Sequence, residues 1–102
     1  MTTGMRYIKM VYEQGSFTKA AEKLFISQPS LSAMVKKTET ELGAAIFDRS
    51  STPLELTEAG QAYLEYIDAT ARNEALLNEK LWDIQNLNKG HICIGGSNYI
   101  LS

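Results

Sequence analysis

The stretch FTKAAEKLFISQPSLSAMVKK, residues 17–37, decides how this chain folds. Its first half groups small and apolar side chains on one side of a helix: Ala20, Ala21, Leu24 and Phe25. A second pattern recurs at the same spacing up to the next glycine: Leu31, Met34, Val35, Thr38 and Leu42. Only Ile26 and Ser27 separate the two patterns. The stretch therefore predicts two helices joined by a tight turn.

Residue types that begin and end helices set the predicted bounds. Either Ser16 or Thr18 can cap the first helix of the pair. The second helix carries three such signals: Ser27 as its cap, Pro29 in its first turn and Gly43 at its end. We expect this second helix to run over residues 28–42.

Polar side chains lie between the apolar ones in both predicted helices: Thr18, Lys19, Lys23, Ser27, Gln28, Ser30, Ser32 and Lys36. A buried apolar set fixes the angle between two helices, and the exposed polar set can then touch a ligand. A helix-turn-helix reader of the DNA major groove needs this division. Other pairs of amphipathic helices show the same alternation without binding nucleic acid, so a helical protein–protein interaction module stays open as the alternative. Phe25 departs from the pattern, because many such motifs have glycine in the turn.

Shorter patterns flank the pair. The segment 5–13 has apolar residues at helical spacing and is followed by Gly15, so it predicts a short helix. Beyond the pair, the apolar runs at 46–47 and 54–56 enclose a Ser-Ser-Thr-Pro cluster, which is typical of a small β-hairpin.

A long helix is predicted from a Thr57 cap to about Asn88, because this segment contains no proline. Five apolar side chains fall near one stripe of it: Tyr63, Ile67, Leu77, Leu81 and Ile84. A helix of ~30 residues is about 45 Å long, more than so small a domain can cover. We therefore expect the stripe to be an exposed seam that needs a partner.

Residues 89–102 change character. Ile92 and Ile94 alternate between glycines, as in a strand, and a lone strand has no sheet to join. We expect this segment to be the start of a second, truncated domain. His91 and Cys93 share one face of the expected strand without a third ligand, so a metal site is not favoured.

Length, composition and charge limit what the chain can be. The chain has 102 residues, 44% hydrophobic and 22% charged, which is enough for one small folded domain. Its net charge is −2, so the average charge gives no indication of a nucleic-acid partner. The acidity is uneven: residues 1–56 hold seven Lys and Arg against six Asp and Glu, whereas residues 57–88 hold two against six.

Several classes of protein are disfavoured. The single cysteine cannot form an internal disulfide, so a cytoplasmic location is expected. There is no apolar run of the ~20 residues that a membrane helix requires. One histidine, one cysteine and no glycine-rich phosphate loop give almost no support for an enzyme.

Four sequence blocks, in this order and spacing, resemble the N-terminal domain of LysR-type transcriptional regulators. Its signature runs S-F-T-x-A-A-x-x-L, S-Q-P-x-L-S, E-x-x-L-G-x-x-L-F-x-R and L-T-x-A-G. The matching segments are residues 16–24, 27–32, 39–49 and 56–60. The resemblance extends from about Met5 to Gly96, where GHICIG is similar to the first strand of the family's ligand-sensing domain.

The resemblance implies a mainly α fold. A winged helix-turn-helix would occupy residues 1–60, with its helix pair at about 17–36 and its wing at about 46–56. A linker helix over 57–88 would pair antiparallel with its mate in a homodimer, and Tyr66 and Trp82 would then pack in the dimer rather than stack on bases. Residues 89–102 would begin the effector-binding domain.

No cofactor or metal is expected in this chain, and a small-molecule effector is expected only for the missing domain. The full-length protein could form a tetramer.

The resemblance also implies the DNA contacts. The recognition helix from Gln28 would enter the major groove, with Gln28, Pro29, Ser30 and Ser32 near base edges. Five further residues are expected at phosphates: Thr18, Lys19, Lys36, Lys37 and Arg49. Ser27 completes the predicted set. Structural roles are the competing interpretation, and for Arg49 this would be an ion pair with Asp48 or Glu55.

Three departures from the family pattern bear on base preference. Many members have arginine at the position of Ala33, glutamine at that of Met34, and a wing arginine at that of Thr52. We therefore expect weaker direct readout here and more reliance on DNA shape.

Overall fold

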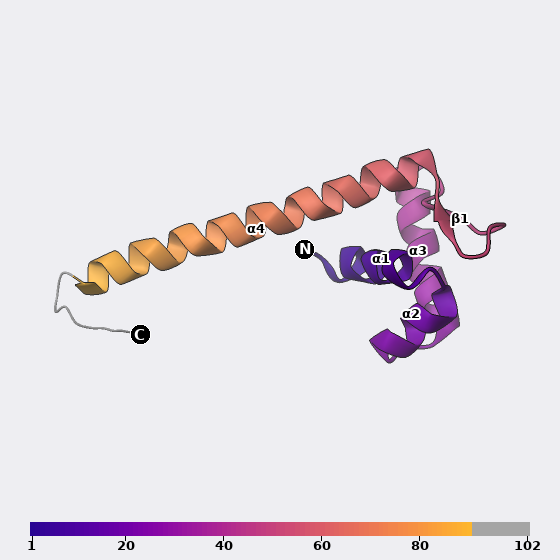
Figure 1. Ribbon diagram of the computed structural model, residues 1–102, viewed down its shortest axis with the longest axis horizontal. Coiled ribbons are helices and arrows are strands. Elements are labelled where there is room, and N and C mark those ends of the chain that lie inside the picture. The colour runs from indigo at the N-terminus through magenta and orange to yellow at the C-terminus, as the bar shows by residue number, and fades with distance from the viewer. Residues whose placement is uncertain (91–102) are drawn as a thin grey trace. The chain divides into compact units, whose positions relative to one another are not determined.

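The computed structural model describes residues 1–90. The helices are α1 (Thr3–Gln14), α2 (Phe17–Leu24), α3 (Gln28–Leu42) and α4 (Glu58–Gly90), and a hairpin of β1 (Phe47–Asp48) and β2 (Glu55–Leu56) precedes α4 (Figure 1). The two strands pair antiparallel, with Phe47 opposite Leu56 and Asp48 opposite Glu55. This is the predicted mainly α, winged helix-turn-helix architecture with a long final helix.

Local signals explain why the helices begin and end where they do. The Ser16 and Ser27 hydroxyls accept backbone N–H bonds at the starts of α2 and α3. Gly15 and Gly43 end α1 and α3 in the left-handed conformation that glycine tolerates. The predicted bounds of α3 are confirmed, and α1 is two residues longer at its start than predicted.

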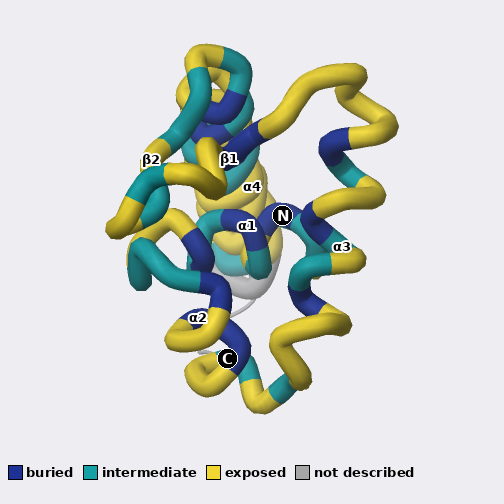
Figure 2. Tube along the Cα trace, turned by 90° about the vertical axis from the view of Figure 1, so that its right-hand side faces the viewer, coloured by how far each residue is buried: buried dark blue, intermediate teal, exposed yellow. Residues whose placement is uncertain are grey.

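The chain divides into two units, residues 1–69 and residues from Thr70 onward, so the first turns of α4 belong to the first unit. The core of the first unit is apolar and joins α1, α2, α3, the hairpin and the start of α4. Figure 2 shows the buried segments of α1, α2 and α3 facing one another. The largest side chains that are fully buried in this core are Ile8, Val11, Leu31, Val35, Ile46 and Ile67.

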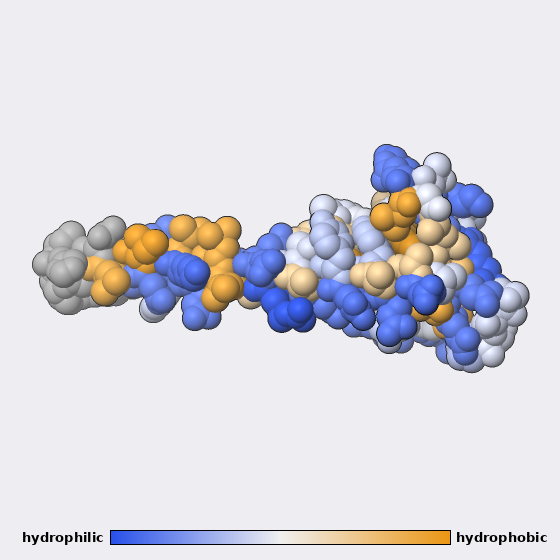
Figure 3. Space-filling model, turned by 90° about the horizontal axis from the view of Figure 1, so that it is seen from above, coloured by the Kyte–Doolittle hydropathy of each residue, from blue (hydrophilic) through white to orange (hydrophobic). Residues whose placement is uncertain are grey.

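The second unit, as far as the structure describes it, is the remainder of α4. Its large apolar side chains are exposed: Leu76, Leu77, Leu81, Trp82, Ile84 and Leu87. Figure 3 shows hydrophobic side chains gathered over this end of α4. The expected strand at residues 92–94, together with His91 and Cys93, lies outside the described residues.

Candidate nucleic-acid interface

The turn between α2 and α3 is tight because Phe25 takes a left-handed conformation, with φ at 58°. Its N–H donates to the carbonyl of Glu22 at 3.3 Å, and the N–H of Ile26 donates to that of Ala21 at 3.1 Å. A non-glycine residue rarely adopts this conformation, and the Phe25 ring is 95% exposed. Phe25 therefore takes the left-handed backbone conformation that glycine usually supplies in this turn, although its side chain disfavours that conformation.

The helix pair is held at its angle by buried side chains. Ala20, Ala21, Leu31 and Val35 are all buried, and α1 packs against both helices. Small residues on α2 let the helices approach closely, and Leu31 and Val35 lie one turn apart on α3. The opposite side of the pair is thereby fixed in its orientation toward solvent.

The structure exposes the predicted contact residues of both helices. Eight of them are exposed: Thr18, Lys19, Ser27, Gln28, Pro29, Ser30, Lys36 and Lys37. Ser32 is half-buried, and Arg49, on the wing, is exposed. Ser27 is partly engaged as the helix cap: its Oγ accepts from the Ser30 N–H at 3.2 Å and donates to the Ser30 Oγ at 2.8 Å.

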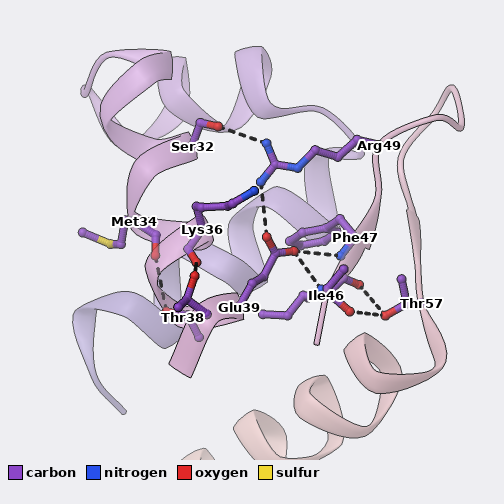
Figure 4. Close-up of polar contacts among 11 residues, drawn as sticks. Ser32, Met34, Lys36, Thr38, Glu39, Ile46, Phe47, Arg49 and Thr57 are labelled. Atoms are coloured by element: carbon purple, nitrogen blue, oxygen red, sulfur yellow. Dashed lines mark hydrogen bonds and ion pairs between the residues drawn. The ribbon is translucent and has the colours of Figure 1, made fainter. Parts of the chain in front are cut away.

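Glu39 attaches the wing to α3, a role that the sequence patterns above do not predict. Its carboxylate is buried and accepts from the backbone N–H of Ile46 at 2.8 Å and of Phe47 at 3.4 Å (Figure 4). The signal was present, since Leu31, Val35 and Glu39 lie four residues apart on one stripe. An acidic residue on a buried stripe needs a donor, and here the donors are the amides that begin β1.

The side chain of Arg49 reaches from the wing to α3. Its Nη1 donates to Ser32 Oγ at 3.0 Å, and its Nη2 is 3.6 Å from Glu39 Oε1 (Figure 4). The guanidinium carbon is 4.5 Å from the centroid of the Phe17 ring, a cation–π contact. The prediction that Arg49 pairs with Asp48 or Glu55 is wrong, because Arg49 makes its ion pair with Glu39 of α3 and not with a residue of the hairpin.

A shallow hollow of about 340 Å³ lies beside this guanidinium. It is lined by residues at the start of α2, by Gln28 at the start of α3 and by the wing: Gly15, Ser16, Phe17, Gln28, Arg49, Ser51, Thr52, Pro53 and Leu54. The start of the recognition helix and the wing thus border one open surface.

Two charged groups outside this surface have displaced pKa values. The hydroxyl and then the N–H of Ser50 donate to Asp48 in the wing turn, and these bonds lower the pKa of its carboxyl. A 2.9 Å ion pair and hydrogen bond to Asp68 raises the pKa of Lys9, tying α1 to the start of α4. Both therefore support the scaffold in their charged forms.

The five predicted seam residues do not share one environment. Ile67 is fully buried in the first unit, so its assignment to a dimer seam is wrong: a side chain without exposed surface cannot meet a partner. Tyr63 is half-buried against the same core. Leu77, Leu81 and Ile84 in the second unit are 45–56% exposed.

No helix within the described residues is long and apolar enough to cross a membrane. In the same part of the chain, no three His, Cys, Asp or Glu side chains gather in a way that could hold a metal ion.

Known proteins share both the sequence and the fold. The family model described as "Bacterial regulatory helix-turn-helix protein, lysR family" matches residues 2–61. The "Probable RuBisCO transcriptional regulator" of Cyanidium caldarium is 44% identical over 96 residues, which are 91% of this chain and 29% of that protein. The protein of the same name from Synechocystis is 34% identical over 93 residues, 91% of this chain and 27% of its own. The chain thus spans less than a third of these relatives.

Solved structures agree. The crystal structure of the BenM_DBD/benA site 1 DNA complex has a TM-score of 0.72 and 35% identity, and the match covers 80% of this chain and 92% of that one. The CbnR_DBD–DNA complex has a TM-score of 0.71 and 28% identity, covering 80% and 94%. From its matched domain, its wing and its helix pair, this chain belongs to the lysR family of bacterial regulatory helix-turn-helix proteins.

Proposed function

We propose that this chain is the sequence-specific DNA-binding part of a LysR-type transcriptional regulator that acts in the cytoplasm as a homodimer. The recognition helix α3 enters the major groove, and the wing lies on the adjacent backbone or minor groove. The BenM and CbnR domains, which share this fold, were solved with DNA.

One observation carries the proposal: the start of α3 presents a polar, exposed face whose reverse side is buried in the core. Gln28 and Ser32 are one turn apart on that face, and Pro29 is exposed beside them. Residues at the start of a recognition helix are the ones that reach base edges. A glutamine amide can bond adenine through two hydrogen bonds, and a serine hydroxyl can bond several bases.

The phosphate contacts are assigned to cations and hydroxyls at the margins of that face. Lys36 and Lys37 follow on α3, and Thr18 and Lys19 begin α2. All four side chains are exposed. Such contacts position a reader on the duplex without selecting a sequence.

The homodimer is supported by apolar surface on α4. Leu77, Leu81 and Ile84 fall within one narrow stripe of the second unit, and each is about half exposed. In the first unit, Tyr63 lines an apolar hollow of about 310 Å³ with Leu42 and Tyr66. Surfaces of this kind on a soluble domain are typical of subunit contacts.

The test is selection of bound duplexes from a random pool, followed by titration of the selected site at several salt concentrations. A two-fold symmetric site with half-sites about one helical turn apart, or a multiple of it, supports the proposal. A linear fall of log K with log salt, with a slope of several units, is expected from phosphate contacts in two subunits. No measurable affinity at low salt would favour the helical interaction module instead.

A further inference from the structure

Ser32 is the one predicted contact whose hydroxyl is already bonded to the wing. Arg49 Nη1 donates to Ser32 Oγ at 3.0 Å. A hydroxyl has one hydrogen to donate and two lone pairs to accept. Because a cation occupies one lone pair and draws electron density from the oxygen, the remaining lone pair is a poorer acceptor and the O–H a better donor.

The guanidinium that does this is held from three sides. Glu39 lies 3.6 Å away, Phe17 supports the planar group from below at 4.5 Å, and Ser32 accepts from it. Glu39 is itself fixed, because the two amides at the start of β1 donate to its buried carboxylate. The position of Arg49 is therefore set by the core of the first unit (Figure 4).

The same arrangement makes Arg49 a poor phosphate ligand. Its charge is paired with a carboxylate that is only 10% exposed. A phosphate would have to compete with Glu39 for the guanidinium. Lys36 and Lys37, by comparison, are exposed on α3.

We propose that Arg49 is a specificity-positioning residue: held by Glu39 and Phe17, it fixes the Ser32 hydroxyl as a hydrogen-bond donor toward the base edge. This rests on the proposed DNA binding through α3. In the major groove guanine, adenine and thymine present acceptors, whereas cytosine presents only an amino donor. Ser32 in this state discriminates against cytosine at the position that it faces.

The experiment uses the chain with its selected site and with duplexes carrying each base at each position. In Arg49→Lys the charge remains, but an ammonium cannot span Glu39 and Ser32 as the planar guanidinium does. We expect discrimination against cytosine to fall about fivefold at one position, as for the loss of one hydrogen bond. Affinity for random duplex and the salt slope should stay unchanged. Unchanged discrimination, with a salt slope about one unit smaller in Arg49→Gln on all duplexes, would identify a phosphate contact and overturn the proposal.

Matched variants separate the roles. Ser32→Ala should lose the same discrimination, and adding Arg49→Lys to it should have no further effect. Lys37→Gln, which removes an exposed cation from the same helix, should lower the salt slope and leave base discrimination intact. Independent effects of Arg49→Lys and Ser32→Ala would show that the two residues do not act together.

A second variant covers the case in which Arg49→Lys lowers the thermal unfolding midpoint. Glu39→Gln keeps the size of the side chain and an oxygen for the β1 amides, but it removes the ion pair with the guanidinium. We expect a partial loss of discrimination at the same base position. Full discrimination in a folded Glu39→Gln variant would contradict the proposal. If the unmodified chain binds no duplex at low salt, the proposed function itself fails, before any variant is compared.

Discussion

In the proposed function, we expect base readout to depend most on Gln28. It is exposed at the first position of α3, and the position of Ala33 on the same helix offers no side chain that can bond a base. Gln28→Ala should weaken binding to the selected site by ~1 to 3 kcal/mol if the contact to adenine is bidentate. Binding to random duplex should change much less, as measured by anisotropy titration at one salt concentration. Equal losses on both duplexes would refute the base-reading role.

Gly60 is required for stability, because the fold leaves no space for a Cβ atom at this position. A Cβ at this position would lie 2.0 Å from the carbonyl oxygen of Ile46, a backbone atom that cannot move aside as a side chain can. Gly60→Ala should lower the free energy of unfolding by about 2 to 3 kcal/mol, in spite of the higher helix propensity of alanine. Denaturant unfolding checks this.

Gly4→Ala is the matched control for Gly60→Ala. Gly4 also lies in a helix, and its nearest neighbour would be 4.0 Å from the new Cβ. The free energy of unfolding of the Gly4→Ala variant should stay the same or rise slightly, by up to about 0.5 kcal/mol. Equal destabilisation of both variants would mean that close approach to Ile46 is not the cause.

Among the elements, the junction of the hairpin and α4 depends on one hydroxyl. Thr57 Oγ1 accepts from the Gly60 N–H at 2.9 Å and donates to the carbonyls of Ala45 and Ile46. Thr57→Val keeps the shape but removes the helix cap, so that the Gly60 N–H and the Ala45 carbonyl lose this hydroxyl as a partner, whereas the Ile46 carbonyl still accepts from the Thr57 N–H at 2.9 Å. We expect a loss of about 1 to 2 kcal/mol in urea unfolding. Thr57→Ser should restore most of it, and failure of this rescue would argue against the hydroxyl.

The wing turn should respond to acid through Asp48. Its pKa is lowered below the ordinary value of 3.8, chiefly by the Ser50 hydroxyl. A carboxyl with a depressed folded-state pKa adds stability above its unfolded-state pKa, and this is lost as pH falls through the folded-state value. The thermal midpoint of Asp48→Ala should therefore lie below that of the unmodified chain at pH 7, and the difference should close below 3.8. Ser50→Ala should show the same closing difference, and a gap that persists in acid would exclude this cause.

Elements whose signals are local could be predicted from the sequence, and contacts between elements could not. Ser27 and Gly43 bound α3 because a cap and a left-handed glycine act within a few residues. The sequence predicts Arg49 as a functional residue, but its partner Glu39 is ten residues away and becomes its neighbour only when the wing folds back on α3. The prediction for Ile67 is wrong because one apolar stripe runs through two environments: its first part packs in the domain core, and its later part is exposed.

At the scale of the whole molecule, charge is distributed unevenly along the chain. Residues 1–56 carry one net positive charge, whereas residues 57–88 have two basic residues against six acidic ones. The net charge of −2 is the sum of +1 over residues 1–56, −4 over residues 57–88 and +1 from Lys89. Since a weakly charged reader gains little from electrostatics alone, the proposed function predicts that tight binding comes from two readers on one DNA molecule.

The proposed dimer is tested by Leu77→Glu. Leu77 is 55% exposed on the stripe with Leu81 and Ile84, and a carboxylate placed there would have to lose its water among apolar side chains when two such stripes pack together. Sedimentation should show a monomer, affinity for a duplex with two half-sites should fall at least tenfold as avidity is lost, and the salt slope should fall to roughly half. Affinity for a single half-site should not change. Ala75→Glu adds the same charge about 160° around the helix from Leu77 and should leave the dimer intact. A dimer that survives Leu77→Glu would place the interface elsewhere, and a monomer that keeps full affinity for the double site would separate DNA binding from dimerisation altogether.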